Sequence, residues 1–279
     1  MINMTFSCIA VECEYIHNNE GYDKLIDSVG PVCMDGDYII ISETPVSTAE
    51  GNLVDESGIQ PSISGRILYY ISRYLWGYIL CPLLKDKKRT INNLQKLPAE
   101  AIVHKEFILR RYGLRYGLMP TGEAGVDLSN VPDEYVSLLP DNPDNSANII
   151  KQLLKDRYSR NVEVIIIDTD ATYEIFNRKF TALPKSIKDI KNNLGIYAYL
   201  LKFISKELGP TILASTINLD CDLLIRIALA CEKKQVNCSD EFFETVYDMK
   251  DNFNSNIKNV TIQMLSDTKH IPAVIYRNK

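Results

Sequence analysis

The 279-residue chain lacks the cysteine and histidine patterns that bind zinc. Its seven cysteines include no C-x-x-C pair, and it contains only three histidines. A zinc site needs three or four such ligands at close spacing, so we do not expect one. Free, mostly buried thiols in a reducing compartment explain this cysteine content better than disulfides do.

The chain also lacks a basic excess and the common catalytic motifs. Its net charge is −5 and its pI is near 5.4, whereas nucleic-acid-binding domains are usually basic, so we expect no nucleic-acid partner. No G-x-x-x-x-G-K-[ST], G-x-G-x-x-G, H-E-x-x-H or G-x-S-x-G sequence occurs, and no nucleophile or other catalytic residue can be assigned. A polyanionic ligand would need metal ions or a local basic pocket to offset the acidic surface.

No membrane partner or export signal is predicted. The longest apolar stretch, residues 67–84, is interrupted by Arg73, Gly77 and Pro82, and a charge at the centre of a membrane span is costly. An amphipathic helix with one buried face fits this stretch better. The first residues show no basic segment ahead of an apolar run, so we expect a cytoplasmic protein.

The hydrophobic pattern predicts an α+β fold with mixed or antiparallel sheets and flanking helices. Strands are predicted at 4–11, 38–41, 162–167, 260–265 and 272–276, with two more within 101–119 joined through Gly113. Helices are predicted at 21–29, 45–51, 64–78, 146–158, 195–208, 219–234 and 240–251. A break at 209–211 separates two of these helices. Because no repeat or linker is visible, we expect a single domain over residues 1–279.

Two acidic segments are candidate ligands for a hard cation. Asp127 follows Gly125, where the backbone can approach a ligand closely, and Asp168 follows the apolar strand at 162–167. Two carboxylates with the Thr169 hydroxyl suit an octahedral Mg²⁺ or Mn²⁺ that bridges nucleotide phosphates, and Asn130 can contact a phosphate or ribose. Alternatively, both aspartates are turn residues that cap backbone N–H groups. Their spacing leaves both interpretations open.

Several segments, in order, resemble the coenzyme F420-0:L-glutamate ligase (gamma-glutamyl ligase) family. Residues 123–131 (E-A-G-V-D-L-S-N-V) and 138–147 (L-L-P-D-N-P-D-N-S-A) are similar to its N-A-G-[IV]-D-x-S-N and L-L-P-x-D-P-D-x-S-A motifs. Residues 164–169 are similar to its V-x-I-x-D-T strand end. Residues 35–51 resemble its D-G-D-V-L-V-V and I-S-K-A-E-G segments, and 271–277 resemble I-P-A-V-x-x-R. The core of the similarity is therefore 35–51 and 122–169, with a divergent helical part at 170–265.

The resemblance implies a gamma-glutamyl ligase-like fold and an acid–amino-acid ligase that uses GTP. Such enzymes join glutamate through a gamma-linked amide to a carboxylate acceptor, the precursor of the deazaflavin coenzyme F420, by way of an acyl phosphate. They need divalent metal and form homodimers. Carried over by position, the resemblance makes Asp127 and Asp168 metal ligands, places Thr169 at a second metal and makes Asn130 a nucleotide contact.

This sequence departs from the family pattern on the nucleotide side. Thr48 stands where I-S-K-A-E-G has lysine, residues 12–16 replace a G-L-P-L-I loop with E-C-E-Y-I, and residues 170–175 lack the family's glycines. A further acidic ligand has only the candidates Asp220 and Asp222. The candidate nucleotide-binding residues are thus Asn130, Thr44 and Thr48. The candidate metal ligands are Asp127, Asp168, Thr169 and Asp170.

Three functions follow from these residues. The first is a divergent GTP- and metal-dependent ligase that forms a gamma-glutamyl or similar amide. Because of the departures, the second is a non-catalytic or regulatory paralogue. The third, from the acidic pair alone, is a metal-dependent phosphohydrolase.

Overall fold

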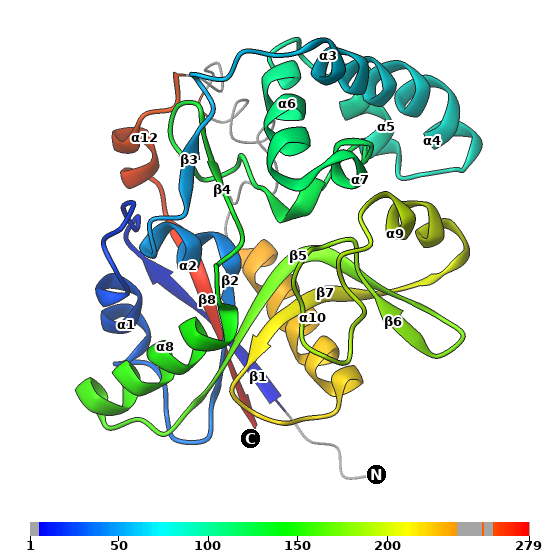
Figure 1. Cartoon of the computed structure of the whole chain (residues 1–279). Coiled ribbons are helices and arrows are strands. Elements are labelled where there is room, and N and C mark those ends of the chain that lie inside the picture. Colours follow the sequence, from blue (N-terminus) through cyan, green and yellow to red (C-terminus); the bar gives the residue numbers. More distant parts are fainter. Residues whose placement is uncertain (1–5, 239–252, 254–258, 279) are drawn as a thin grey trace.

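The structure, a computed structural model, describes residues 6–238, 253 and 259–278 (Figure 1). Its main sheet has six strands: β1 (Phe6–Cys13), β2 (Tyr38–Ser42), β5 (Glu163–Ile175), β6 (Arg178–Phe180), β7 (Lys206–Ser215) and β8 (His270–Asn278). They run in the order β1-β8-β2-β5-β6, and β7 also pairs with the long β5. The β2–β5 pair is parallel, whereas the other pairs of this sheet are antiparallel. The predicted α+β fold with a mixed sheet is confirmed.

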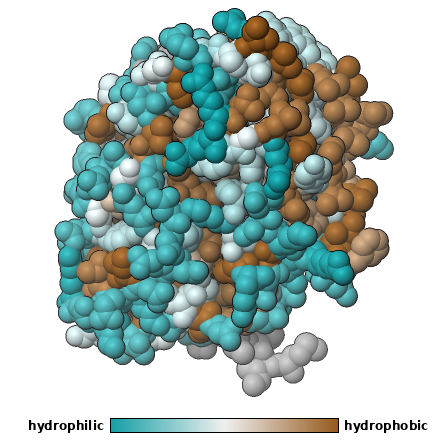
Figure 2. Space-filling model, in the orientation of Figure 1, coloured by the Kyte–Doolittle hydropathy of each residue, from teal (hydrophilic) through white to brown (hydrophobic). Residues whose placement is uncertain are grey.

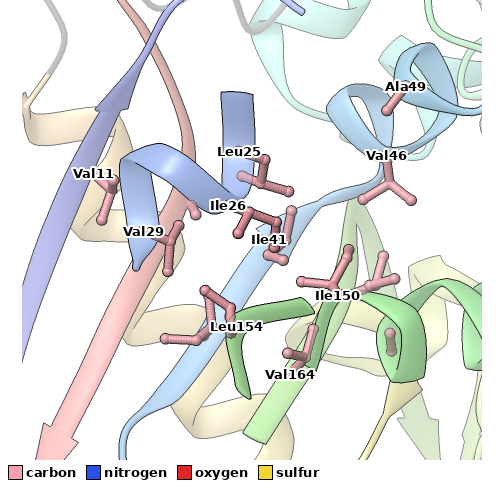
Figure 3. Close-up of a cluster of buried hydrophobic side chains, with 14 of the residues drawn as sticks. Val11, Leu25, Ile26, Val29, Ile41, Val46, Ala49, Ile150, Leu154 and Val164 are labelled. Atoms are coloured by element: carbon pink, nitrogen blue, oxygen red, sulfur yellow. The ribbon is translucent and has the colours of Figure 1, made fainter. Parts of the chain in front are cut away.

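Helices cover both faces of this sheet. Ile41 of β2 and Val164 of β5 point toward α1 (Asp23–Val29) and α8 (Pro143–Tyr158), where they form one buried cluster (Figure 3). The intervening Ile40, Ile165 and Ile167 form a second cluster with α10 (Cys221–Cys238) on the opposite face. Side chains alternate between the faces of a strand, so an uninterrupted apolar run produces two cores.

A helical layer packs above the main sheet in Figure 1, next to a small sheet of β3 (Leu53–Asp55) and β4 (Tyr135–Ser137). Its core is built around Trp76, Leu94, Phe107 and Ile108. Among the described residues, the remaining α-helices are α2 (Glu43–Ala49), α3 (Ile63–Tyr70), α4 (Cys81–Leu83), α5 (Lys88–Gln95), α6 (Ala101–Tyr112), α7 (Leu114–Gly117), α9 (Ile196–Leu201) and α12 (Ile262–Ser266).

The long apolar stretch forms one continuous helical run. A π-helical segment, Ile71–Leu80, joins α3 to α4. Ser72, Trp76 and Gly77 are buried on its inner face, and Gly77 leaves room for α5, because a Cβ there would lie 3.2 Å from the Gln95 backbone nitrogen. The expected helix with one buried face is confirmed. Among the described residues, no helix combines the length and apolarity needed to cross a membrane.

Most predicted elements are confirmed, but the two strands expected within 101–119 are the helices α6 and α7. The reason is visible in α6, where three adjacent buried side chains are the charged or polar His104, Lys105 and Glu106. Their partners satisfy them inside the protein, so the buried face of this helix does not show as an apolar periodicity.

Three further expectations about the C-terminal part are wrong. The helix expected at 195–208 is shorter, because α9 ends at Leu201 and residues 206–208 already belong to β7. The predicted break at 209–211 lies inside β7, where Pro210 is tolerated because the β5–β7 ladder shifts register beside it. Residues 260–265 are not a strand; α12 begins there, capped by the Thr261 hydroxyl, which accepts a hydrogen bond from the Met264 N–H at 3.2 Å. The helix expected at 240–251 lies outside the described residues. The cysteines are free, and most of their thiols are buried.

Candidate metal and nucleotide site

The parallel pairing of β2 with β5 places two carboxylates side by side. Ser42 is the register partner of Ile167, so the next residues along the two strands are Glu43 and Asp168. Both side chains are buried. Glu43 begins α2, and its Oε1 accepts a hydrogen bond from Thr44 at 2.9 Å. Its Oε2 is buried with no hydrogen-bond partner among the described residues.

Asp127 reaches the same place from the segment before β4. Its backbone is held by two hydrogen bonds with Ser137, at 2.9 and 2.8 Å. Its Oδ1 accepts from the Ser129 N–H at 2.8 Å and its Oδ2 from the Ser129 hydroxyl at 2.7 Å. The Thr44 hydroxyl lies 3.4 Å from the same Oδ2, which joins Asp127 to the start of α2.

Asp168 does not end its strand, contrary to the sequence prediction, because β5 continues to Ile175. The ladder with β7 is interrupted here instead: Asp168 pairs with Thr211, and the next paired residue is Ala171, opposite Pro210. The two intervening residues, Thr169 and Asp170, have no register partner on β7. Such an irregularity redirects side chains out of the sheet. Asp170 donates its N–H to Asp168 Oδ1 at 2.6 Å.

Both aspartates therefore cap backbone N–H groups, as the turn interpretation predicted. The capping contacts do not use every lone pair, since a carboxylate offers about four acceptor positions. Capping and ligand binding are compatible at Asp127 and Asp168. We call Glu43, Asp127, Asp168 and Asp170 the acidic cluster.

Two glycines let a neighbouring turn approach the acidic cluster. Gly122 and Gly125 have positive φ values of +65° and +66°, a conformation that favours glycine. A Cβ on Gly122 would lie 2.9 Å from Asp170 Oδ2, and one on Gly125 would lie 2.9 Å from Asp168 Oδ2. The turn between them carries the buried Glu123.

Burial raises the pKa values of these carboxyl groups, and neighbouring carboxylates add to the effect at three of them. Burial, and then the charge of Asp127, raises the pKa of Glu43 to about 8. Burial followed by Asp127 and Glu123 raises the pKa of Asp170 to about 7. For Asp168, burial with Glu43 and Asp170 holds the pKa well above its usual range, and burial also raises the pKa of Asp127. Like charges brought together in this way favour a proton or a cation between them.

Two cavities meet at the acidic cluster. The smaller, about 310 Å³, is bordered by residues 14–16, α2, α10 and the start of β8. The larger, about 810 Å³, extends from the cluster to α5 and α6. Glu43, Asp127 and Thr169 line both, so they form the wall that the two cavities share.

The candidate nucleotide-binding residues lie together in the smaller cavity, which Thr44, Thr48 and Asn130 all line. Thr48 donates its hydroxyl to the Thr44 carbonyl of its own helix at 2.8 Å. Asn130 adopts a left-handed conformation with φ of 57°. The acidic Glu14 also lines this cavity.

Two sequence candidates lie elsewhere. Asp220 caps the start of α10, accepting from the Asp222 N–H at 3.0 Å, and Asp222 pairs with Lys179 at 3.0 Å. Neither lines a cavity that contains the acidic cluster. They do not supply the further ligand.

The sequence interpretation missed Glu43 and the buried charges of the larger cavity. In the sequence, Glu43 follows the apolar run of β2 as Asp168 follows the apolar run of β5. This similarity could have identified Glu43 as a further acidic site residue. The missed charges form two pairs: His104 Nδ1 lies 2.9 Å from Glu56 Oε1, and the Lys105 ammonium contacts Glu123 and the Met119 carbonyl. Nothing in their spacing along the chain predicts these pairs.

The residues present fit a magnesium-like ion. The orphaned Glu43 Oε2 and the hard oxygen donors of the acidic cluster suit such a cation. Within the described part of the chain, no three Asp, Glu, His or Cys side chains converge closely enough to hold a metal by themselves. Magnesium commonly takes only one or two carboxylates, with substrate phosphates and water completing its coordination.

Comparison with known proteins decides the family. A family model described as F420-0:gamma-glutamyl ligase matches residues 12–277. The chain belongs to the F420-0:gamma-glutamyl ligase family. The match includes residues 170–265, where the motifs alone show little resemblance, and both cavities of this gamma-glutamyl ligase family member lie within it.

Relatives of known sequence agree with this assignment. An uncharacterised protein of Methanocaldococcus jannaschii is 35% identical over 285 aligned positions, which cover 96% of this chain and 95% of that protein. Coenzyme F420:L-glutamate ligases of Methanopyrus kandleri and Methanothermobacter thermautotrophicus are each 33% identical, over 135 and 158 positions. Those alignments cover 48% and 54% of this chain and 48% and 51% of the two ligases. The similarity to the named ligases thus spans about half of their length.

Proposed function

We propose that this protein is a GTP- and metal-dependent ligase that forms a gamma-glutamyl or similar amide on a carboxylate acceptor, such as the precursor of coenzyme F420. The observation that carries the proposal is the shared wall of Glu43, Asp127 and Thr169. A phosphate-transfer site needs a nucleotide on one side of a charge-stabilising group and an acceptor on the other. Family membership supports the same reaction class.

In this proposal the two cavities have different roles. The smaller cavity takes the nucleotide, with Asn130, Thr44 and Thr48 as contacts. Asp127, Asp168 and Asp170, with the Thr169 hydroxyl, would each serve as a ligand of Mg²⁺ or Mn²⁺, one or two carboxylates to an ion with phosphate and water completing its coordination, and the metal would neutralise phosphate charge when bound. The larger cavity admits the acceptor, whose carboxylate meets the γ-phosphate at the shared wall. Its volume of about 810 Å³ lies within the range of small-molecule sites.

Calorimetry on the wild type and Asp168→Asn tests the metal and nucleotide assignments. We expect GTP to bind the wild type only with Mg²⁺ or Mn²⁺, and Asp168→Asn to weaken this binding at least tenfold. Phosphate release should require both glutamate and the acceptor. The absence of metal-dependent GTP or ATP binding would refute the ligase proposal, and hydrolysis without an acceptor would support a phosphohydrolase instead.

Two observations favour a second candidate, a non-catalytic or regulatory paralogue. Thr48 replaces a lysine of the family motif, and its hydroxyl is turned to its own helix. Glu14 adds negative charge to the smaller cavity. Metal-dependent nucleotide binding without glutamate-dependent phosphate release would support this candidate. Release that needs glutamate and disappears in Asp127→Asn would exclude it.

We further propose a homodimer, supported by an apolar stripe on the outer face of α3 and the π-helical segment. Figure 2 shows apolar residues gathered over this part of the molecule. The exposed stripe consists of Ile63, Ile67, Tyr70, Tyr74 and Tyr78, whose spacing of three and four residues places them on one side of the helix. Exposed apolar patches of this kind mark interaction sites.

Sedimentation analysis tests the dimer. Tyr74→Glu places a charge in the middle of the stripe, so we expect the variant to sediment as a monomer at micromolar concentration. Tyr197→Glu is the matched control, because Tyr197 is also an exposed tyrosine but lies on α9. A monomeric wild type, or a dimeric Tyr74→Glu, would contradict the assignment.

A further inference from the structure

The larger cavity contains a histidine that none of the roles above uses. His104, on α6, is only 8% exposed and lines the cavity. Its Nδ1 lies 2.9 Å from Oε1 of the buried Glu56, which follows β3. Within the described residues its Nε2 has no hydrogen-bond partner. Nε2 is therefore the ring atom left for a ligand.

The contact with Glu56 prepares the ring to accept a proton. A carboxylate on Nδ1 favours the tautomer with hydrogen on Nδ1 and a lone pair on Nε2, and it stabilises the imidazolium that forms. The charged groups that face His104 are Glu56, Glu123 from the adjacent turn and Lys105 from its own helix. Burial opposes the protonated ring, but Glu56 and Glu123 outweigh burial and Lys105, so the pKa of His104 is raised.

The charge of the larger cavity attracts an ammonium group beside the bound acceptor. Its lining contains more than twice as many Asp and Glu residues as Lys and Arg residues, and a cleft of one sign concentrates ligands of the opposite charge. An amino acid enters such a cavity through its ammonium group. As an ammonium the nitrogen has no lone pair, so it becomes a nucleophile only after it loses a proton.

We propose that the larger cavity binds the amino-acid substrate of the ligase, and that His104, oriented by Glu56, accepts the proton from its attacking nitrogen. This inference rests on the proposed ligase function. The bound ammonium first gives one proton to His104 Nε2. The amine nitrogen then forms a bond to the carbonyl carbon of the acyl phosphate, the bond from that carbon to the phosphate oxygen breaks, and phosphate leaves with the electron pair. The second proton, which the new amide nitrogen loses, passes to the departing phosphate.

The position of the cavity fits this order of events. The turn at Glu123 connects the histidine to the acidic cluster, since Glu123 acts on His104 and on Asp170, and Gly122 packs against the Asp170 carboxylate. His104 and the shared wall of Glu43, Asp127 and Thr169 therefore line the same cavity. An acyl phosphate that forms at this shared wall would therefore face the amine of an amino acid bound in the larger cavity.

Hydroxylamine separates the two halves of the reaction. It is a nucleophile that is largely unprotonated at neutral pH, so it traps an acyl phosphate as a hydroxamate without help from a base. The assay uses the full chain with GTP, Mg²⁺ and the F420 precursor, and measures hydroxamate with hydroxylamine and amide with L-glutamate. We expect His104→Gln to lower kcat with glutamate by ~10²–10⁴-fold, while hydroxamate formation changes by only a few fold.

Two further variants complete the test. Glu56→Gln should move the acidic limb of the kcat/KM profile for glutamate to lower pH, because His104 loses the charge that raises its pKa. His17→Gln, which removes a histidine outside both cavities, should leave both reactions unchanged. A hydroxamate signal from His104→Gln also shows that this variant is folded.

The outcomes distinguish this inference from the function on which it rests. Normal glutamate turnover by His104→Gln, or equal losses in both reactions, would overturn the role of His104 and leave the ligase standing. A wild type that forms neither hydroxamate nor amide would overturn the proposed ligase and this inference together.

Discussion

Gly125 lies against Asp168 so closely that a Cβ on the glycine would stand 2.9 Å from Asp168 Oδ2. The same Cβ would meet the side chains of Leu139 and Leu183 at 2.9 Å. Distances under about 3 Å force a neighbouring group to move, and here two of the three neighbours are buried core side chains. Because Gly125 has no side chain, the turn that carries Glu123 can pack directly against Asp168 of the acidic cluster.

Gly125→Ala should therefore destabilise the protein and disturb the cluster. We expect a loss of ~2–4 kcal/mol in the free energy of unfolding, from overpacking and from a left-handed backbone. Gly36→Ala is the matched control, because its φ is +84° but a Cβ there meets nothing within 4 Å; it should lose ~1–2 kcal/mol. Urea unfolding measures both, and equal losses would show that the close approach to Asp168 has no cost.

Thr48→Lys should strengthen nucleotide binding. The substitution restores the cation of the family motif in a cavity lined by Glu14 and Asp127. A charge-assisted contact to phosphate contributes ~1–3 kcal/mol, so calorimetry with GTP and Mg²⁺ should give a Kd lower by ~5–150-fold. Thr48→Met supplies similar bulk without charge and should not tighten binding. If the methionine variant binds as tightly as the lysine variant, phosphate is not the group beside residue 48.

Glu43→Gln should stabilise the metal-free protein at high pH. Burial and then Asp127 raise the folded-state pKa of Glu43 from 4.5 to about 8. The stability from its protonated form is complete below about pH 4.5 and is lost as pH rises through about 8. With EDTA present, the variant should match the wild type near pH 5 and exceed it at pH 9, on the order of 2–4 kcal/mol in unfolding free energy.

A surface carboxyl provides the control for this pH effect. Glu100→Gln removes the same charge at an exposed position, so its unfolding curve should follow the wild type at both pH values. Added Mg²⁺ should stabilise the wild type at pH 9 more than it stabilises Glu43→Gln. A variant that gains no stability at high pH would mean that neither burial nor its neighbours disfavour the Glu43 carboxylate.

Lys105→Met should be strongly destabilising. Lys105 is 2% exposed and pairs with the buried Glu123, so the substitution leaves one buried carboxylate unpaired beside Asp170. Breaking such a pair costs ~3–5 kcal/mol in unfolding free energy. The double variant Lys105→Met/Glu123→Gln removes both charges and should recover at least half of the loss. If it does not, the lysine contributes by packing rather than by its charge.

Part of the candidate site could be predicted from the sequence because it lies in short motifs of neighbouring residues. Asp127 and Asp168 stand in short motifs whose order matches a family, and Thr169 is adjacent to one of them. Glu43 was missed because its position depends on which strand pairs with which: β2 and β5 are more than 100 residues apart and meet only in the sheet. The bulge that exposes Thr169 depends likewise on β7.

The helical layer shows a different limit. Apolar periodicity predicts helices whose buried face is apolar, and it succeeded for α1, α8 and α10. It failed for α6, whose buried face carries His104 and Lys105. A charge can be buried only when a partner is supplied from elsewhere in the fold, and Glu56 and Glu123 are those partners.

By itself, the sequence determined the fold class, the two apolar cores and the ligase family, because hydrophobic alternation and short motifs are properties of neighbouring residues. Only the tertiary structure decided that four carboxylates gather in one cluster, that Glu43, Asp127 and Thr169 separate two cavities, and that His104 faces the larger one. Electrostatic interactions depend on distance through space. Strand pairing and helix packing set those distances, and no spacing along the chain records them.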